Sequence, residues 1–243
     1  MMADTKKRRG AILWAALGGL VLIAAASVLV VASLVRTPVE PGPDPSATSP
    51  SSDPTLTATA GPGDVVDPDV SERGWVPEPI TRDQDEYARA ALTAAGTFDT
   101  TLNSRSEWLT WLKTWFTPSP LYDNEQDALD QMARYQTELD QAVVLPLELW
   151  NDLASDDGRV TARVDGDLDF LDLPETTAEN LWTASADLVL TYTRSTPEGE
   201  VSYDETVRVS VQVVCDGEST PTPGSSQQPG DCKVVRFFDE AVG

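Results

Sequence analysis

Histidine is absent from the 243 residues of this chain, and basic side chains are scarce, with 17 lysines and arginines against 40 acidic residues. Without histidine, a Ser-His-Asp triad, a Cys-His pair and His-ligated zinc are excluded. The formal charge of −23 argues against a nucleic-acid partner, because phosphate contacts need clustered lysine and arginine. The same charge argues against a protein that lies flat on an anionic membrane surface.

Cysteine is almost absent as well. The only two, Cys215 and Cys232, flank sixteen residues rich in Pro, Gly, Ser, Thr and Gln. Alternating sequences lie on both sides of this loop, so the cysteines end one predicted strand and begin the next. We predict a disulfide between them that holds the sheet where a tight turn is missing; two free thiols are the alternative. Disulfides persist in oxidising compartments, which favours a site outside the cytoplasm.

Charged side chains are missing from residues 11–35, AILWAALGGLVLIAAASVLVVASLV. About 20 apolar residues cross the hydrocarbon core, so this segment predicts a membrane-spanning helix. A cleaved signal peptide is the alternative, but its apolar region normally runs for only about 7–15 residues. Four basic residues precede the segment: Lys6, Lys7, Arg8 and Arg9. The positive-inside rule then keeps residues 1–10 in the cytoplasm and places the rest of the chain outside.

Residues 36–80 form a predicted disordered linker. They contain ten prolines, many serines and threonines, and a single aromatic residue, Trp75. Such a segment cannot bury enough apolar surface to offset the entropy of ordering it. The linker would hold the following domain away from the membrane, and Trp75 would either dock on that domain or remain in solvent.

Three amphipathic helices are predicted at the start of the domain that spans residues 81–243. Thr81–Gln84 and Ser104–Glu107 both have the form of a capping box. The first helix has an apolar face that consists of Tyr87, Ala90, Ala91, Ala94 and Phe98. The third is expected from about Asn124 to Gln141, with these residues inward: Leu129, Met132, Tyr135 and Leu139.

The second predicted helix contains three tryptophans, Trp108, Trp111 and Trp115, within the sequence WLTWLKTWF. Their spacing is typical of a helix that packs its aromatic face on a sheet. A ligand cage or a membrane-surface helix is the alternative. The acidic surroundings disfavour the membrane, so we interpret the three as core residues.

After residue 141 the hydrophobic period changes from helical to two. Alternating runs at 158–164, 185–194 and 201–215 predict antiparallel strands, and residues 232–240 predict a last one. Pro197–Gly199 is a turn signal, so the second and third runs should form a hairpin. AVVLPLELW, residues 142–150, is a possible first strand, placed at an edge by its proline. The predicted fold class is α+β, with three helices packed on a curved antiparallel sheet.

The stretch YARAALTAAGTFDTTLNSRSEWLTWLKTWFTPSPLYDN, residues 87–124, carries a resemblance to a known family. Its alanine-rich first helix, short connector and EWL..L..WFTP-type residues resemble the bitopic, nuclear-transport-factor-2-like subunits of actinobacterial and other Gram-positive conjugation (type IV secretion) systems. Mycobacterial Mce-associated membrane proteins share the architecture. The likeness covers roughly residues 80–240. Within that range, the cysteine pair and the loop between the two cysteines match no pattern of the family.

The resemblance implies a cone-shaped domain and a scaffold protein without catalytic activity. From the residues themselves we expect no cofactor and no bound metal. It also implies assembly with itself and with other secretion-complex subunits of the cell envelope. We therefore expect a single-pass protein of the cell membrane whose C-terminal domain is extracytoplasmic. The main alternative is a small-ligand binding or sensing module that uses an internal cone cavity. An envelope enzyme is a third hypothesis.

Candidate sites within the predicted domain are few. Asp165, Asp167 and Asp169 imitate the start of a calcium loop, but the glycine and the glutamate that such a loop requires are replaced by Phe170 and Thr176. A solvated strand edge is the simpler interpretation. Four tyrosines could face a pocket: Tyr87, Tyr135, Tyr192 and Tyr203. Three polar residues of one strand face offer either a docking surface or a solvated face: Asp204, Arg208 and Gln212.

Overall fold

The structure, a computed structural model, describes residues 65–171, 178, 180–215, 217 and 219–242. The predicted cytoplasmic segment, the predicted membrane span at 11–35 and residues 36–64 lie outside this described part. Within it, no helix combines the length and the apolar character needed to cross a membrane.

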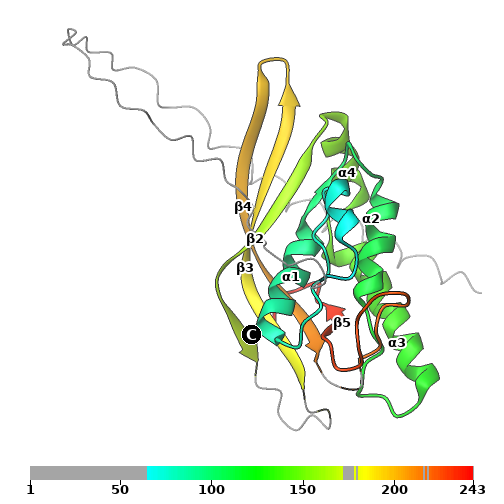
Figure 1. The fold of residues 1–243 in the computed structure, drawn as a ribbon. Coiled ribbons are helices and arrows are strands. Elements are labelled where there is room, and N and C mark those ends of the chain that lie inside the picture. The colour runs from blue at the N-terminus through cyan, green and yellow to red at the C-terminus, as the bar shows by residue number, and fades with distance from the viewer. Residues whose placement is uncertain (1–64, 172–177, 179, 216, 218, 243) are drawn as a thin grey trace, which may run out of the picture. The chain divides into compact units, whose positions relative to one another are not determined.

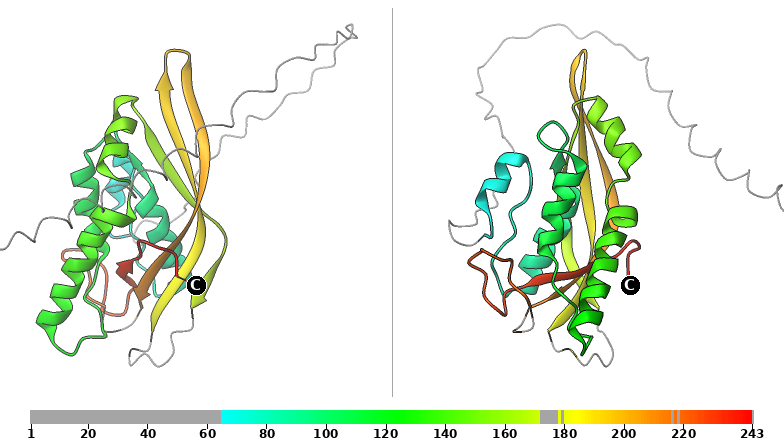
Figure 2. Two further views of the ribbon diagram at one scale, coloured as in Figure 1. Left: turned by 180° about the vertical axis from the view of Figure 1, so that it is seen from behind. Right: turned by 90° about the vertical axis from the view of Figure 1, so that its right-hand side faces the viewer.

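The described part is an α+β domain, as the sequence predicts. Its sheet is an antiparallel meander whose strands follow one another in chain order: β1 (Phe98–Asp99), β2 (Arg159–Leu171), β3 (Leu181–Thr196), β4 (Gly199–Val214) and β5 (Lys233–Phe237). Its α-helices are α1 (Gln84–Gly96), α2 (Arg105–Leu112), α3 (Glu125–Glu138) and α4 (Leu147–Ser155). The helices lie along one side of the curled sheet (Figure 1), and the view from behind at the left of Figure 2 shows the same separation.

Helix boundaries follow local capping chemistry, with one correction to the prediction. Asp83, and not Thr81, caps α1, because its carboxylate accepts from the backbone N–H groups of Asp85 and Glu86. The capping box predicted at Ser104 and Glu107 is present and starts α2. α2 then tightens into a short 3-10 turn, η2 (Lys113–Trp115).

The predicted strand at 142–150 is wrong, because its second half forms the helix α4. Pro146 occupies the N-cap position with φ −56°, a backbone angle that suits the start of a helix. Trp150 and Leu153, three residues apart, are buried, while Leu147 and Leu149 are exposed. An apolar run whose pattern suits a short strand is therefore an amphipathic helix, and the described residues of the domain form four α-helices where three were expected.

Two residues of the predicted helix faces lie elsewhere. Phe98 does not extend α1 but forms β1 with Asp99, paired with Arg159 and Val160 of β2. Leu129 of α3 is exposed, although it was expected to point inward. Leu139, by contrast, is fully buried, in a π-helical turn that continues α3, η3 (Leu139–Val143).

The predicted hairpin is present as β3 and β4, which pair over their whole length from Leu181–Val214 to Thr196–Gly199. Tyr192 and Tyr203 face each other across the two strands, with parallel rings 5.0 Å apart. The tip of this hairpin extends past the helices at the top of Figure 1.

The core is aromatic where the helices meet the sheet. Trp108 and Trp115 are fully buried, and Trp108 packs against Phe98 and Trp150 with ring centroids 5.0 and 5.6 Å away. Trp111 differs from the core position expected for it, because it is only partly buried. The aromatic helix therefore has two core tryptophans and one at the margin of the domain.

The domain begins earlier than residue 81, so the linker prediction is wrong for residues 65–80. This segment contains a 3-10 helix, η1 (Pro68–Arg73), and a bridge between Val65 and Pro79. Trp75 docks on the domain: it is 4% exposed and stacks on Trp111 with centroids 5.0 Å apart. A high proline content indicates a linker only where no neighbouring surface covers the apolar side chains of the segment. Here α2 provides a surface that covers Trp75.

A disulfide joins Cys215 to Cys232, and it links the end of β4 to the start of β5. The adjacent residues Val214 and Lys233 form the last pair of that ladder. The loop that the disulfide closes folds back over the domain, where the backbone N–H of Thr220 donates to the Thr117 hydroxyl. The disulfide predicted from the positions of the two cysteines, at the end of one alternating run and the start of the next, is confirmed.

The disulfide should contribute about 3 kcal/mol to the free energy of unfolding, the value the chain-entropy model gives for a loop of this size. The double variant Cys215→Ala/Cys232→Ala of the full-length chain tests this by urea denaturation. Wild type unfolded in reductant is the matched control and should agree with the variant. Without reductant, denatured wild type should contain no titratable thiol; two thiols would contradict the bond.

Candidate functional site

A buried ion pair lies where three distant segments meet. Glu78, from the segment before α1, and Lys233, the first residue of β5, are 2% and 1% exposed, and Lys233 Nζ lies 2.7 Å from Glu78 Oε1. The ammonium also donates to the Thr114 carbonyl at 2.9 Å and to the Thr222 hydroxyl at 2.8 Å. An ammonium has three N–H donors, so all the donors of Lys233 are engaged.

Two further donors converge on the same oxygen of Glu78. The Tyr87 hydroxyl donates to Oε1 at 2.6 Å, and Nε2 of Gln227 donates to Oε1 at 3.1 Å. The other carboxylate oxygen, Oε2, is buried and accepts no hydrogen bond from the residues that the structure describes. One oxygen of Glu78 is therefore saturated, while its neighbour lacks a donor.

Burial controls the protonation of this cluster. Burial lowers the pKa of Lys233, and the adjacent Glu78 carboxylate offsets only part of that change. Burial also raises the pKa of Tyr87 well above its usual value, and the negative charge of Glu78 raises it further. Tyr87 consequently keeps its proton and remains a donor to Glu78.

Tyr87→Phe should lower the free energy of unfolding by about 1.5–3 kcal/mol near neutral pH, the range for a hydrogen bond to a charged group. The raised pKa of Tyr87 means that the folded chain keeps a proton that the unfolded chain loses above about pH 10. The stability that Tyr87 adds is thus complete below pH 10 and declines as pH rises further.

Urea denaturation of wild type and Tyr87→Phe at several pH values measures this difference. The matched control is Tyr122→Phe, which changes an exposed tyrosine. A stability difference between wild type and Tyr87→Phe that grows above pH 10 would contradict the assignment.

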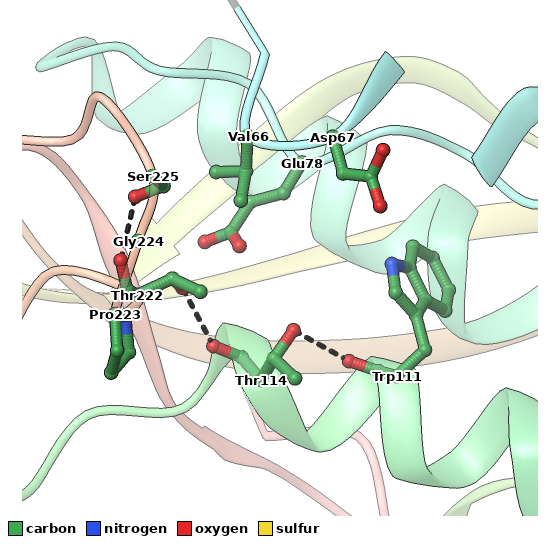
Figure 3. A pocket seen from close by; sticks show the side chains of 9 residues that line it. All are labelled: Val66, Asp67, Glu78, Trp111, Thr114, Thr222, Pro223, Gly224 and Ser225. Atoms are coloured by element: carbon green, nitrogen blue, oxygen red, sulfur yellow. Dashed lines mark hydrogen bonds between the residues drawn. The ribbon is translucent and has the colours of Figure 1, made fainter. Parts of the chain in front are cut away.

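A hollow of about 360 Å³, here named the Glu78 pocket, adjoins this cluster. It is lined by Val66, Asp67, Glu78, Trp111, Thr114, Thr222, Pro223, Gly224 and Ser225. Figure 3 shows the carboxylates of Glu78 and Asp67 and the indole of Trp111 around one space. The walls of the pocket therefore come from residues 65–80, from α2 and η2, and from the loop that the disulfide closes. They offer acceptors and an aromatic face, which suits a ligand that carries donors and positive charge.

A second hollow, of about 320 Å³, lies between α1, residues 142–146 and the sheet; it is named the α1 groove. Apolar side chains line most of it, including Leu92, Phe98, Leu188, Leu190 and Val207. It is the counterpart of the internal cone cavity that the sequence analysis considered. Its character suits an apolar molecule, because it offers few polar groups.

The four tyrosines considered as pocket residues share no pocket; only Tyr192 and Tyr203 come together, as stacked rings on the β3–β4 hairpin. Tyr192 alone lines the α1 groove, and burial, with the negative charge of Glu205, raises its pKa to about 12. Tyr87 belongs to the Glu78 cluster, and Tyr135 lies under the Arg236 guanidinium, 4.9 Å from its ring centre. These positions give no shared site for acid–base chemistry.

The aspartates that imitate a calcium loop lie in strand β2. Asp165 pairs with Arg163 at 2.8 Å, and Asp169 pairs with Arg208. The register of β2 against β3 shifts between Asp165 and Asp169, so this stretch is an irregular strand edge. Over the described ranges, no group of three or more metal-ligating side chains comes together.

The polar face of β4 is partly committed to internal contacts. Arg208 also contacts Asp187 of β3 at 3.3 Å, and Asp204 accepts from the Thr191 hydroxyl at 2.7 Å. Gln212 donates to the Thr183 hydroxyl. This face is therefore held mainly by cross-strand pairs.

Sequence reasoning missed the Glu78 cluster. Glu78 lies in a segment with the composition of a linker, and Lys233 begins an alternating strand sequence where a lysine is normally solvated. A charged residue next to the second cysteine, in a strand with apolar neighbours, was the one available signal. Gln227 gives no signal at all within its polar loop.

Comparison with known proteins finds distant structural similarity. No protein-family model and no curated protein sequence matches the chain. An IcmL-like type IV secretion system protein from Legionella pneumophila is 16% identical, with a TM-score of 0.41 over 64% of this chain and 91% of that chain. The periplasmic domain of DotI is 15% identical, with a TM-score of 0.36 over 62% and 87% of the two chains. CagV, a VirB8 homolog from Helicobacter pylori, is 14% identical, with a TM-score of 0.29 over 61% and 95%.

Proposed function

We propose that this chain is a membrane-anchored, non-catalytic assembly subunit of a conjugation or secretion complex in the cell envelope. Residues 11–35 would form its anchor, residues 1–10 would stay in the cytoplasm, and residues 36–64 would link the anchor to an extracytoplasmic domain. The uncharged segment, the basic residues before it and the disulfide support this arrangement. The resemblance of residues 87–124 supports the choice of complex.

The β3–β4 hairpin is the observation that carries the proposal of an assembly role. All residues from 199 to 206 of β4 are exposed, on both faces of the strand. β5 pairs only with residues 211–214, so the outer edge of this half of β4 has no strand partner among the described residues. Val201 and Tyr203, large apolar side chains, are about half exposed there.

A free strand edge is a template for pairing with another chain. Partners that add a strand to such an edge gain main-chain hydrogen bonds, and side chains such as Tyr203 supply selectivity. The negative charges of Asp204 and Glu205 in this half of β4 oppose indiscriminate pairing of one copy with another. We infer that residues 199–206, the hairpin tip, are a docking surface for another subunit of the complex.

In-cell photo-cross-linking of the tagged full-length chain tests the proposal. A photoreactive phenylalanine analogue at Tyr203 should trap envelope proteins, identified by mass spectrometry as this chain or as secretion-complex subunits. The matched control places the analogue at Tyr122, an exposed tyrosine in another part of the described domain. Cross-links that are equal at both positions, or monomer alone at Tyr203, would contradict the docking surface.

The α1 groove supports a second candidate function, a binding or sensing module for a small apolar ligand. A ligand that binds only the native state adds RT ln(1 + [L]/Kd) to its stability. A panel of apolar ligands should then raise the melting temperature of wild type but not of Ala95→Phe, which fills the groove. If no ligand raises the melting temperature, this second function is excluded for that panel.

A further inference from the structure

Glu78 Oε2 is buried and has no hydrogen-bond donor among the residues that the structure describes. Glu78 as a whole is 2% exposed. Leaving a buried carboxylate oxygen unsatisfied is unfavourable, and native structures rarely do so. The surrounding side chains donate no hydrogen bond to Oε2, because Lys233, Tyr87 and Gln227 all donate to Oε1.

The unsatisfied oxygen belongs to a wall of the Glu78 pocket, where Asp67 and Trp111 also lie (Figure 3). Asp67 uses one carboxylate oxygen to accept from the backbone N–H of Asp69 at 3.0 Å. Trp111 stacks on Trp75, and the Arg73 guanidinium lies 5.2 Å from the Trp75 ring centre. The Trp75 ring of this stacked pair therefore already makes a cation–π contact with Arg73.

The charges around the pocket do not balance. Lys233 forms an ion pair with Glu78, whereas Asp67, an exposed residue of the lining, has no ion-pair partner among the described residues. A ligand with one positive charge would complete the balance, and an indole face stabilises such a cation when it comes close. If the ligand also carries an N–H donor that reaches Oε2, this oxygen gains the hydrogen bond that it lacks.

We propose that the Glu78 pocket binds a primary ammonium group. One N–H would donate to Glu78 Oε2, Asp67 would supply the opposite charge, and Trp111 would cover the ammonium and its first methylenes. A quaternary ammonium has the charge but no N–H, so it satisfies only part of this site. The ammonium belongs either to a free amine or to a lysine of another protein, since both present the same chemistry.

Calorimetric titration of the full-length chain, purified in a nonionic detergent, tests the proposal with n-butylammonium at constant ionic strength. Saturable binding is expected, at least about tenfold tighter than for tetramethylammonium, because the latter makes no charge-assisted hydrogen bond. n-Butanol, which lacks the charge, should bind more weakly still. Equal affinity for n-butylammonium and tetramethylammonium, or no saturable binding, would overturn the proposal.

Two variants of the lining locate the site. Asp67→Asn keeps a side chain that caps η1 but removes the charge, and it should weaken n-butylammonium binding about fivefold. Trp111→Leu should weaken it by a similar factor, about fivefold, through loss of the cation–π contact. The matched control is Asp69→Asn, an exposed carboxylate two residues away that does not line the pocket. If Asp67→Asn and Asp69→Asn have the same effect, binding is not at this site.

Glu78→Gln tests the buried acceptor itself. Glutamine removes the negative charge and, with its amide nitrogen in place of Oε2, presents a donor where the ammonium needs an acceptor, so n-butylammonium binding should disappear. Urea denaturation establishes whether this variant folds. If it does not fold, the comparison of Asp67→Asn with Asp69→Asn decides the proposal.

Zero-length carbodiimide coupling in cells distinguishes the two sources of the ammonium. A lysine peptide of another protein joined to Asp67 or Glu78, and lost in Asp67→Asn, identifies a protein lysine. Binding of n-butylammonium without any such cross-link identifies a free amine. Both results support an ammonium site, and only the titration can overturn it.

Discussion

Lys233→Met should lower the free energy of unfolding by about 3–5 kcal/mol, the usual cost of removing one partner of a buried ion pair. The expectation follows from burial, because Lys233 and Glu78 are almost inaccessible to solvent. Without the ammonium, the Glu78 carboxylate would stay buried with only Tyr87 and Gln227 as donors. The carbonyl of Thr114 would also lose the ammonium that donates to it.

The double variant Glu78→Leu/Lys233→Met is the matched control. Removing both charges removes the uncompensated carboxylate, so much of the lost stability should return. Urea denaturation of the single and double variants, analysed as a double-mutant cycle, gives the coupling between the two residues. If Lys233→Met alone costs less than about 1 kcal/mol, the pair would be no stronger than an exposed ion pair.

Trp108→Ala should lower the free energy of unfolding by about 3–5 kcal/mol, the range for a buried aromatic residue cut back to alanine. Trp108 is fully buried, and its ring packs between Phe98 of β1 and Trp150 of α4. The substitution leaves a cavity where two helices meet the edge of the sheet. The surrounding rings are rigid, so they should not close it.

Trp108→Phe is the informative companion variant. The indole N–H of Trp108 is buried and has no acceptor among the described residues, so phenylalanine removes an unsatisfied donor along with part of the ring. We expect less than half of the loss caused by Trp108→Ala, measured by urea denaturation. Trp182→Ala, a partly buried tryptophan with Phe170 as its ring neighbour, should cost less than Trp108→Ala. Equal losses for Trp108→Ala and Trp182→Ala would contradict the assignment of Trp108 to the centre of the core.

Several features of this domain follow from local sequence alone. The capping box at Ser104 and Glu107 starts α2, because the two side chains satisfy backbone donors within a single turn. Alternating side chains on either side of Pro197–Gly199 predict the β3–β4 hairpin, and the register agrees. Cys215 and Cys232 end and begin successive strands, so the pattern predicts their disulfide as well.

Other features depend on surfaces that the chain brings together only when it folds. Residues 142–150 are apolar enough for either a strand or a helix, and the helix α4 forms where Trp150 packs on Phe98, with rings 4.3 Å apart. Trp75 lies in a segment with the composition of a linker, and it is buried because Trp111 covers it. Local periodicity does not reveal either outcome, because burial depends on the partner.

The Glu78 cluster shows the same limit most clearly. Glu78 and Lys233 are separated by 155 residues, and neither belongs to a recognisable motif. By itself the sequence determined the acidic charge, the absence of histidine chemistry and the alternation of the strands, and it predicted the disulfide that the structure contains. Only the tertiary structure decided which carboxylate is buried and which of its oxygens lacks a donor. Desolvation and hydrogen bonding are properties of the assembled surroundings, and no local pattern encodes them.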